Sequence, residues 1–240
     1  MTAADRVLVI VPAHNEAEAL PDVLDQLRRH APGYDVVVVN DGSTDDTARV
    51  AREAGVPVLD MCFNLGIGGA VQAGFKYAIE HGYAIAVQMD ADGQHVADQI
   101  ERIVAPVRAG ECELCIGSRF LEDTEYDGSF WRRLGTRYLS RVSSIVTGQR
   151  ITDATSGFRA VGPRALRYLA WHYPSDYPEP ESIVLLSRHG LPIREVAVRM
   201  RPRQAGKSSI SGPAAFYYMA KVSLSLLLAV FKEGPTRQAV

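Results

Sequence analysis

Two short runs of β-branched residues near the N-terminus constrain the fold of this chain most. RVLVIV (residues 6–11) and DVVVV (residues 35–39) show no alternation of apolar and polar residues. Strands covered on both faces of a parallel sheet have this pattern, because neither face meets water. Between the runs, Leu20, Val23, Leu24 and Leu27 lie at helical spacing, and a Pro-Gly pair follows them. The sequence therefore predicts a strand–helix–strand unit.

The same alternation continues along the chain and predicts an α/β fold with a mostly parallel sheet flanked by helices. In the first half we expect helices over residues 44–54 and 69–81 and strands over residues 56–61 and 83–89. In the less regular second half we expect strands over residues 112–117 and 193–200, and helices over residues 163–168, over residues 182–188 and from Trp131 onward. A chain of 240 residues that is 47% hydrophobic can bury one sizeable core of this kind.

Charge and cysteine content narrow the functional classes. The formal net charge is −2, and charges of both signs are scattered, which argues against bulk nucleic-acid binding. Cys112 and Cys115 form one C-x-x-C without a second ligand pair, so we expect no zinc or redox centre. The apolar run Val7–Val11 is too short for a signal peptide, so we expect a cytoplasmic protein. Small-molecule chemistry becomes the default hypothesis.

The stretch QMDADGQH (residues 88–95) ends the fourth apolar run on paired carboxylates. Side chains alternate along a strand, so Asp90 and Asp92 point the same way if the extended backbone continues. Two carboxylates facing one cleft repel each other, and a hard cation such as Mg²⁺ or Mn²⁺ relieves that repulsion, with a diphosphate supplying further ligands. Gln94 adds an oxygen on the same side. Alternatively, Asp92-Gly93 forms only a polar turn.

Two further polar stretches follow predicted strands, where ligands of open parallel sheets bind. In NDGSTDDT (residues 40–47), Asp41 is placed to accept hydrogen bonds from a base or ribose, and Thr44 can also cap a helix. NLGIGGAVQAG (residues 64–74) offers backbone amides for an anion. Its glycines also imitate a Rossmann fingerprint, but the spacing from Gly66 puts the last glycine at Val71. An oxidoreductase stays open as an alternative.

Taken together, these motifs resemble those of a known family. PAHNE (residues 12–16), NDGSTD (residues 40–45) and the D-x-D-like strand end resemble the family 2 glycosyltransferases, which have the GT-A fold. DADGQH, IGSRF, DATSGFR and RQAGKSS further resemble the dolichyl-phosphate mannose synthase branch, and the likeness runs from Val7 to Ile210. The resemblance implies a metal-dependent, inverting transfer of a sugar from a UDP- or GDP-linked donor to a polyprenyl phosphate, in the synthesis of cell-envelope glycans or glycoconjugates.

The resemblance also implies roles for individual residues. It implies catalytic roles for Asp92, Arg119, Arg132 and Arg203, of which Arg119 and Arg132 face the lipid phosphate and Arg203 the donor diphosphate. It assigns the Mg²⁺ or Mn²⁺ to Asp90, Asp92 and Gln94. It implies contacts to the donor or acceptor for Pro12, Asn15, Glu16, Asn40, Asp41, Gly68, Asp90, Ala91, Thr136 and Ser208. For any single arginine, a solvated basic face is the alternative.

Two departures from the family pattern bear on the acceptor. Asn40 stands where the family has the first Asp of D-D-G-S, so whether this position contacts the base is left open. Members that glycosylate hydroxyls carry a Glu-Asp pair at the start of a late helix, and here the nearest equivalent is Glu181-Ser182. A phosphate acceptor is already ionised near neutral pH and needs no general base. Asp176, Glu179 and Glu181 remain candidates for a displaced base.

The tail differs in composition from the glycosyltransferase domain expected over residues 1–212. Within residues 213–240, residues 214–231 would form an apolar helix about 27 Å long, marginal for a bilayer core of about 30 Å. Lys221 near its middle would cost about 2.5 to 3.5 kcal/mol in a span. We therefore expect the helix to lie in the membrane surface, on the cytoplasmic face. Packing against protein or against a second copy of the chain is the alternative.

Other functional classes stay open from the sequence alone. A family member with a sugar hydroxyl as acceptor would use one of the late carboxylates as its base. A catalytically silent nucleotide-sugar-binding scaffold would use the tail to recruit a membrane partner. An integral membrane subunit and a homo-oligomer are both compatible with the sequence, and no nucleic acid is expected as a partner.

Overall fold

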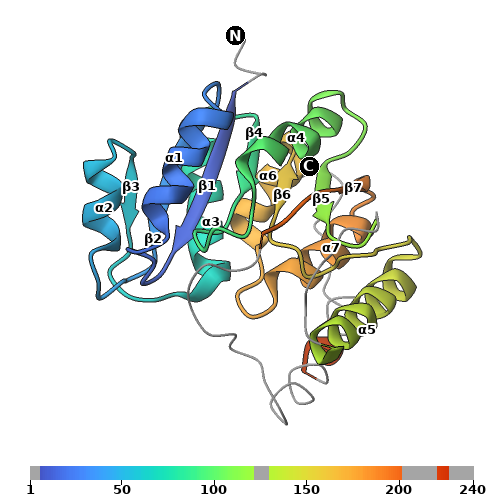
Figure 1. Cartoon of the computed structure of the whole chain (residues 1–240). Helices are drawn as coiled ribbons and strands as arrows, with labels where there is room; N and C mark the ends of the chain where they lie inside the picture. Colours follow the sequence, from blue (N-terminus) through green and yellow to red (C-terminus); the bar gives the residue numbers. More distant parts are fainter. Residues whose placement is uncertain (1–5, 122–129, 202–220, 227–240) are drawn as a thin grey trace.

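The computed structural model describes residues 6–121, 130–201 and 221–226, with residues 130–134 described by their backbone alone. The strands within these residues form one seven-stranded sheet, in the order β3-β2-β1-β4-β6-β5-β7 (Figure 1). Its strands are β1 (Val7–Ala13), β2 (Asp35–Asn40), β3 (Val58–Asp60), β4 (Ile85–Gln88), β5 (Leu114–Ser118), β6 (Arg159–Val161) and β7 (Ile193–Ala197). All neighbouring strands are parallel except β6, which runs antiparallel to β4 and β5. The predicted mostly parallel α/β sheet is confirmed.

Helices cover both faces of the sheet (Figure 1). They are α1 (Leu20–His30), α2 (Thr47–Glu53), α3 (Gly66–Glu80), α4 (Ile100–Arg108), preceded by the short 3₁₀ helix η2 (Ala97–Gln99), α5 (Phe130–Thr147), α6 (Pro163–His172) and α7 (Pro178–Arg188). One core contains α1 and α4 side chains, the other α3, α6 and α7 side chains. Alternate residues of β1 enter the two cores, Val9 on one side and Ile10 on the other. This explains why the strand runs lack polar alternation.

Helix α1 illustrates how local sequence produces these layers. Its buried residues Leu20, Val23, Leu24 and Leu27 recur at the spacing of one helix face. A proline occupies the first turn, where its missing N–H costs nothing, and basic residues occupy the last turn.

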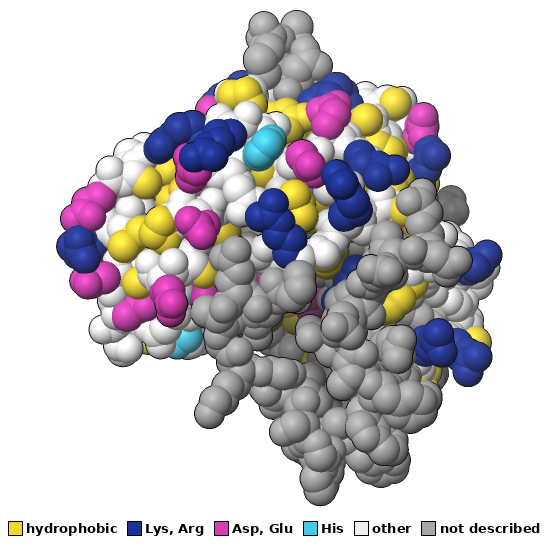
Figure 2. All heavy atoms as spheres, viewed as in Figure 1, with side chains coloured by type: hydrophobic (Ala, Val, Ile, Leu, Met, Phe, Trp, Pro, Cys, Tyr) yellow, Lys and Arg dark blue, Asp and Glu magenta, His cyan; other side chains and the backbone are white. Residues whose placement is uncertain are grey.

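On the face of the molecule shown in Figure 2, acidic and basic side chains are interspersed, as the near-balanced charge leads one to expect.

The second half departs from the predicted elements in two places. Strand β6 was not predicted, because it has only three residues and begins on the buried Arg159. Helix α4 was missed although Ile100, Ile103, Val104 and Val107 have helical spacing, and Pro106 lies inside it. Several ends also differ: β3 and β7 are shorter than predicted, whereas α6 reaches His172 and α7 starts at Pro178.

The predicted apolar tail is described only over residues 221–226, which are helical. Val222 and Leu226 are fully buried against Leu139 of α5, Val184 of α7 and Tyr177, which precedes α7. This short stretch therefore packs on protein, as the alternative interpretation had it. The remainder of the predicted helix lies outside the described residues. Among the residues that are described, no helix is long and apolar enough to span a bilayer.

Candidate active site

The strand-end motifs of the N-terminal half meet at one edge of the sheet. Ala13 at the end of β1 is paired with Asn40 at the end of β2, and Asn40 is paired with Asp60 at the end of β3. Strand β4 lies on the other side of β1, with Gln88 paired to Ile10. Parallel strands end at a common edge, so the residues that follow β1, β2 and β4 converge there. The prediction that these polar stretches form one site is consistent with this arrangement.

The loops after β1 and β2 are bound directly to each other. The backbone N–H of Asn15 donates to Ser43 Oγ at 2.9 Å, and the N–H of Thr44 donates to Asn15 Oδ1 at 2.8 Å. Asn15 has a φ of 56°, a conformation that asparagine tolerates. The helix start predicted at Thr44 is therefore wrong. Helix α2 begins at Thr47, with Asp46 in the position before it, and Thr44 instead donates its backbone N–H to the loop after β1.

Asp41 holds the segment that leads into α3. Its side chain is buried, and Oδ1 accepts the N–H of Leu65 at 2.7 Å. A Cβ on the neighbouring Gly42 would approach the backbone N of Asn64 to 2.6 Å, so glycine is needed for this close contact. Asn40 donates from Nδ2 to Asp60 Oδ1 at 2.6 Å. Asp41 thus fixes the loop that carries the predicted anion-binding amides.

Gly68 lies at the first turn of α3, where the anion site was predicted. A Cβ there would lie 2.3 Å from the carbonyl oxygen of Pro174 and 2.7 Å from Cα of Ser175. The glycine therefore allows the α6–α7 connection to pack against the start of α3. Of the other predicted donor contacts, Pro12 is buried within β1, and Ala91 is buried in the core.

The paired carboxylates Asp90 and Asp92 lie in a polar loop after β4, in which residues 91 and 92 form a turn and the extended backbone does not continue. Asp92 is buried, and it accepts hydrogen bonds from the backbone N–H of Gln94 at 3.0 Å and from the Gln94 side-chain amide. Asp90 is one-third exposed at its side chain, yet its Oδ1 is buried and has no hydrogen-bond partner among the described residues. A buried carboxylate oxygen without a donor suits a bound cation.

His95 fixes the backbone of this loop. Its Nδ1 accepts the N–H of Asp90 at 2.9 Å, and its Nε2 lies 3.8 Å from Asp90 Oδ2. The ring stacks on Phe158 with centroids 4.9 Å apart. The backbone N–H of Arg201 donates to the Gln94 carbonyl at 2.8 Å. These contacts hold the loop in one conformation.

The carboxylates after β4 suit a divalent cation that takes some of its ligands from the protein and the others from a bound substrate. Asp90 and Asp92 supply hard oxygen atoms, as Mg²⁺ and Mn²⁺ prefer. Within the part of the chain that the structure describes, no group of three or more His, Cys, Asp or Glu residues could hold a metal ion. A cation here would need oxygen atoms from a bound diphosphate, as the sequence predicted.

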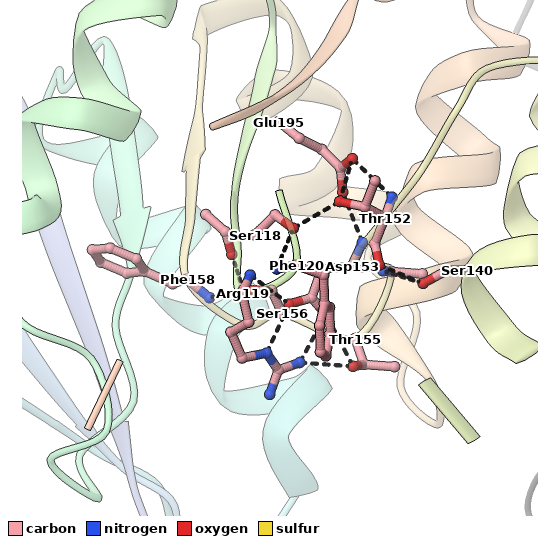
Figure 3. A network of polar contacts seen from close by, with 12 residues as sticks. Ser118, Arg119, Phe120, Ser140, Thr152, Asp153, Thr155, Ser156, Phe158 and Glu195 are labelled. Atoms are coloured by element: carbon pink, nitrogen blue, oxygen red, sulfur yellow. Dashed lines mark hydrogen bonds and ion pairs between the residues drawn. The ribbon is translucent and has the colours of Figure 1, made fainter. Parts of the chain in front are cut away.

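On the other side of β4, Arg119 is bound to Asp153 in a network that joins β5, α5 and β7 (Figure 3). Arg119 Nε and Nη2 donate to the two carboxylate oxygens of Asp153, each at 2.7 Å, and Nη2 also donates to Thr155 Oγ1 at 2.9 Å. Glu195 accepts the backbone N–H groups of Thr152 and Asp153, both at 2.8 Å. Burial raises the pKa of Glu195 against these hydrogen bonds. Arg119 is thus fixed in place by a buried carboxylate.

Arg159 is a residue that the sequence analysis missed. It is 2% exposed, and its guanidinium donates to the carbonyls of Ser156 (2.6 Å), Glu179 (2.8 Å) and Ala154 (3.1 Å) and to Ser182 Oγ (2.9 Å). A buried arginine satisfied in this way joins the 154–156 turn to the start of α7. Arg159 is the last residue of the DATSGFR motif (residues 153–159), which the sequence analysis used only to identify the family resemblance.

The candidate bases have different environments. Burial raises the pKa of Glu179, the charge of Asp90 adds to this, and Arg159 opposes it. Glu181 accepts a hydrogen bond from Ser225 Oγ, and together with Asp176 it lines a cavity of about 400 Å³. Ser182, at the position where a base was looked for, accepts from Arg159 and donates to the Glu179 carbonyl at 3.0 Å. Burial and the nearby charge of Asp90 thus favour the neutral form of Glu179.

The remaining predicted residues are placed only in part. Arg132 lies in α5, but its side chain is outside the described residues, and Thr136 is half-buried one turn further along the same helix. Arg203 and Ser208 lie outside the described residues. The arrangement around the predicted acceptor phosphate therefore stays a prediction.

Comparisons with known proteins identify the family. The sequence matches the model of the family described as Glycosyl transferase family 2 over residues 8–169. It is 35% identical over 218 residues to the undecaprenyl-phosphate mannosyltransferase of Micrococcus luteus, covering 86% of this chain and 88% of that protein. It is 32% identical over 228 residues to the polyprenol monophosphomannose synthase of Mycolicibacterium smegmatis, covering 91% of this chain and 86% of that protein.

The fold has counterparts among solved structures. The glucosyl-3-phosphoglycerate synthase of Mycobacterium tuberculosis, in complex with Mn²⁺, UDP-glucose and phosphoglyceric acid, superposes with a TM-score of 0.69 at 19% identity, covering 94% of this chain and 79% of that one. These matches identify a glycosyltransferase, so the oxidoreductase alternative suggested by the glycine loop is wrong. The chain belongs to glycosyl transferase family 2, has the GT-A fold and is a glycosyltransferase.

Proposed function

We propose that this chain transfers a sugar from a nucleotide diphosphate donor to a polyprenyl phosphate, with a divalent cation and with inversion at the anomeric carbon. The observation that carries the proposal is the carboxylate pair after β4, in which Asp90 Oδ1 is buried without a hydrogen-bond partner among the described residues while Asp92 accepts hydrogen bonds from Gln94. The names of the polyprenyl-phosphate relatives support the acceptor class.

Donor binding uses the edge of the sheet. Asp41 and the loop it fixes lie where the nucleotide would bind, at the carboxyl ends of β1 and β2. The first turn of α3 presents backbone N–H groups, which favour an anion. Asp90 and Asp92 would hold Mg²⁺ or Mn²⁺, which when bound neutralises charge on the leaving diphosphate. Arg203 would add a positive charge to the same group.

Transfer then requires that the acceptor phosphate be oriented toward the anomeric carbon. A phosphate oxygen forms a bond to that carbon as the bond from the carbon to the diphosphate breaks, and the nucleotide diphosphate leaves with the electron pair. Arg119, Arg132 and Thr136 would position the acceptor, and Asp153 fixes Arg119 for this task. The rate enhancement comes from positioning and charge stabilisation, without a covalent enzyme intermediate.

The position of Ser182 supports an ionised acceptor. A hydroxyl acceptor must lose a proton to a base, whereas a phosphate monoester is already charged near neutral pH. Ser182 cannot serve as a base, and its Oγ is committed to Arg159 and to the Glu179 carbonyl. A membrane surface follows as the place of the reaction, since polyprenyl phosphates are lipids, and we place the protein at the cytoplasmic face.

One observation favours a second candidate, transfer to a sugar hydroxyl. The pKa of Glu179 is raised by burial, and raised carboxyl pKa values are typical of general bases. The two candidates are separated by offering the protein a polyprenyl phosphate and, in parallel, the corresponding polyprenol and a panel of sugar alcohols. Product from the phosphate alone supports the proposal. Product from the hydroxyl acceptors alone would transfer the assignment to the second candidate.

A further inference from the structure

A glycine forms the wall against which the first carboxylate of the proposed cation site rests. A Cβ built on Gly157 would lie 3.0 Å from Asp90 Oδ2, 3.2 Å from Asp90 Oδ1 and 3.0 Å from Gln88 Nε2. Gly157 is not among the glycines with a positive φ, so its backbone would accept alanine. Glycine at position 157 is therefore needed to leave room for the side chains of Asp90 and Gln88. The backbone conformation of the turn does not require it.

Gln88 and Asp90 are both short of partners at this contact. Gln88 is 1% exposed, and its Oε1 accepts the hydroxyl of Tyr173 at 3.2 Å, but Nε2 has no hydrogen-bond partner among the described residues. Asp90 Oδ1 is buried and likewise lacks one. No hydrogen bond within the described residues fixes these two atoms, so the shape of the wall helps to decide where the Asp90 carboxylate lies.

The turn that carries Gly157 cannot easily retreat. On one side, Ser156 Oγ donates to the carbonyl of Gly117 in β5 at 2.7 Å. On the other, Phe158 is fully buried and stacks on His95. A side chain added at Gly157 would therefore displace Asp90 and Gln88 more readily than it would displace the turn.

Arg159 anchors the turn from behind. Its Nε holds the Ser156 carbonyl at 2.6 Å, and its Nη1 reaches Ser182 Oγ in α7 at 2.9 Å. Arg159 is paired with Gln88 across the sheet, which places both side chains on one face of it. By strand alternation Asp90 continues on that same face. The arginine thus fixes the turn relative to α7 directly beside the carboxylate pair.

We propose that Gly157, held in place by Arg159, is a positioning residue for the cation: it sets where the Asp90 carboxylate lies and so how tightly the site binds a divalent ion. This inference rests on the proposed function, because it takes Asp90 to be a ligand. Neither residue touches the ion or the substrate. Both act through Asp90, as residues behind a metal ligand commonly do.

The test is the substitution Gly157→Ala, with Gly33→Ala as its matched control. Gly33 also has a φ outside the positive range, and a Cβ there would meet nothing within 4 Å. Mn²⁺ binding to each protein in the presence of UDP is measured by electron paramagnetic resonance, which detects the free ion. Transfer is then measured as a function of Mn²⁺ concentration. We expect Gly157→Ala to weaken Mn²⁺ binding about tenfold, a size found for residues behind a metal ligand.

The split between the two kinetic parameters separates positioning from general damage. Gly157→Ala should raise the Mn²⁺ concentration for half-maximal transfer while kcat at saturating Mn²⁺ is retained, and Gly33→Ala should change neither. Unchanged Mn²⁺ affinity in a folded Gly157→Ala protein overturns the proposal. If that variant shows no cooperative thermal transition, Ser182→Ala decides instead, since it removes a bond of Arg159 without touching Asp90. If Ser182→Ala weakens Mn²⁺ binding, by less than the tenfold expected for Gly157→Ala, the proposal is supported. If the Mn²⁺ affinity of Ser182→Ala is unchanged, the proposal is overturned.

Failure of this inference differs from failure of the proposed function. If the unaltered protein binds Mn²⁺ with UDP and transfers sugar, yet Gly157→Ala behaves identically, only the role of Gly157 is lost. If the unaltered protein itself binds no Mn²⁺ in the presence of any nucleotide diphosphate, the cation site is lost and the inference falls with it.

Discussion

Arg119 donates through Nε and Nη2 to the two carboxylate oxygens of Asp153, each at 2.7 Å. The carboxylate is fully buried and the guanidinium nearly so. Such a pair is rigid, because two parallel bonds fix both planes. It joins the end of β5 to the segment before β6, and it aims an arginine predicted to face the acceptor phosphate. The pair therefore stabilises the fold and also holds Arg119 in the orientation proposed for binding the acceptor phosphate.

Removing the carboxylate should destabilise the fold. Asp153→Ala leaves the Arg119 guanidinium buried without its counter-charge, which we expect to lower the free energy of unfolding by about 3–5 kcal/mol. Urea denaturation followed by circular dichroism measures this. Asp46→Ala is the control, because Asp46, just before α2, makes an exposed ion pair with Arg49 and its side chain forms no capping hydrogen bond. Equal effects of the two substitutions would contradict the structural role of the pair.

Asp92→Ala should abolish transfer while leaving the protein folded. The substitution removes one of the two carboxylates of the proposed cation site and releases Gln94. Product formation is measured with and without Mg²⁺ or Mn²⁺. Asp25→Ala should retain activity, since Asp25 lies in an exposed pair with Arg29 on α1. Full activity of Asp92→Ala after chelation of all divalent metal would rule out this mechanism.

The pKa of Glu179 predicts a pH dependence of stability. Burial raises that pKa above its value in the unfolded chain, so the folded state holds the proton to higher pH. Above the ordinary carboxyl pKa the folded state then binds more protons than the unfolded one, and the free energy of unfolding falls as pH rises through that window. Glu179→Gln removes this dependence.

The corresponding measurement compares urea denaturation of the two proteins between about pH 4 and pH 8, the range above the ordinary carboxyl pKa. We expect the Gln variant to gain stability relative to the unaltered protein as the pH increases. A parallel pH dependence in both proteins would show that Glu179 does not titrate with a raised pKa. The same variant tests the hydroxyl alternative, in which loss of a base should lower kcat strongly.

The described part of the tail should contribute to folding stability. Leu226 is fully buried among side chains of α5 and α7, whereas Leu224, two residues before it, is 57% exposed. Leu226→Ala should lower the free energy of unfolding by about 2–5 kcal/mol, as for other buried leucines, and Leu224→Ala should change it little. Thermal or urea denaturation distinguishes them. The same small effect for both would contradict packing of this stretch on the protein.

The first half of the fold was predictable because its signals are local. Residues 6–11 and 35–39 are apolar without alternation, and the rule that ligands bind at the carboxyl edge of a parallel sheet singled out the polar stretches that follow β1, β2 and β4. The second half was not. Strand β6 is too short to show a period, and its buried Arg159 resembles a surface residue in the sequence.

Residues whose roles depend on distant contacts were equally invisible. Gly157 reads as a turn glycine, and only the approach of Asp90 and Gln88 reveals what its missing side chain allows. Thr44 was predicted to start a helix, but its backbone N–H donates to Asn15, which is distant in sequence, and α2 begins at Thr47. The sequence showed that serine occupies the position of the general base at residue 182. Only the structure shows that Ser182 accepts a hydrogen bond from Arg159. Local pattern predicts elements, and tertiary contacts decide these roles.

Analysis of the lipid product tests the central claim most directly. The protein is incubated with a panel of UDP- and GDP-sugars, Mg²⁺ or Mn²⁺ and undecaprenyl phosphate, and the extracted lipid is identified by mass spectrometry. We predict a lipid carrying one sugar linked through its phosphate, formed from at least one donor by the unaltered protein and absent with Asp92→Ala. Sugar attached only to hydroxyl acceptors, or no glycosylated lipid from any donor, would contradict the proposed function.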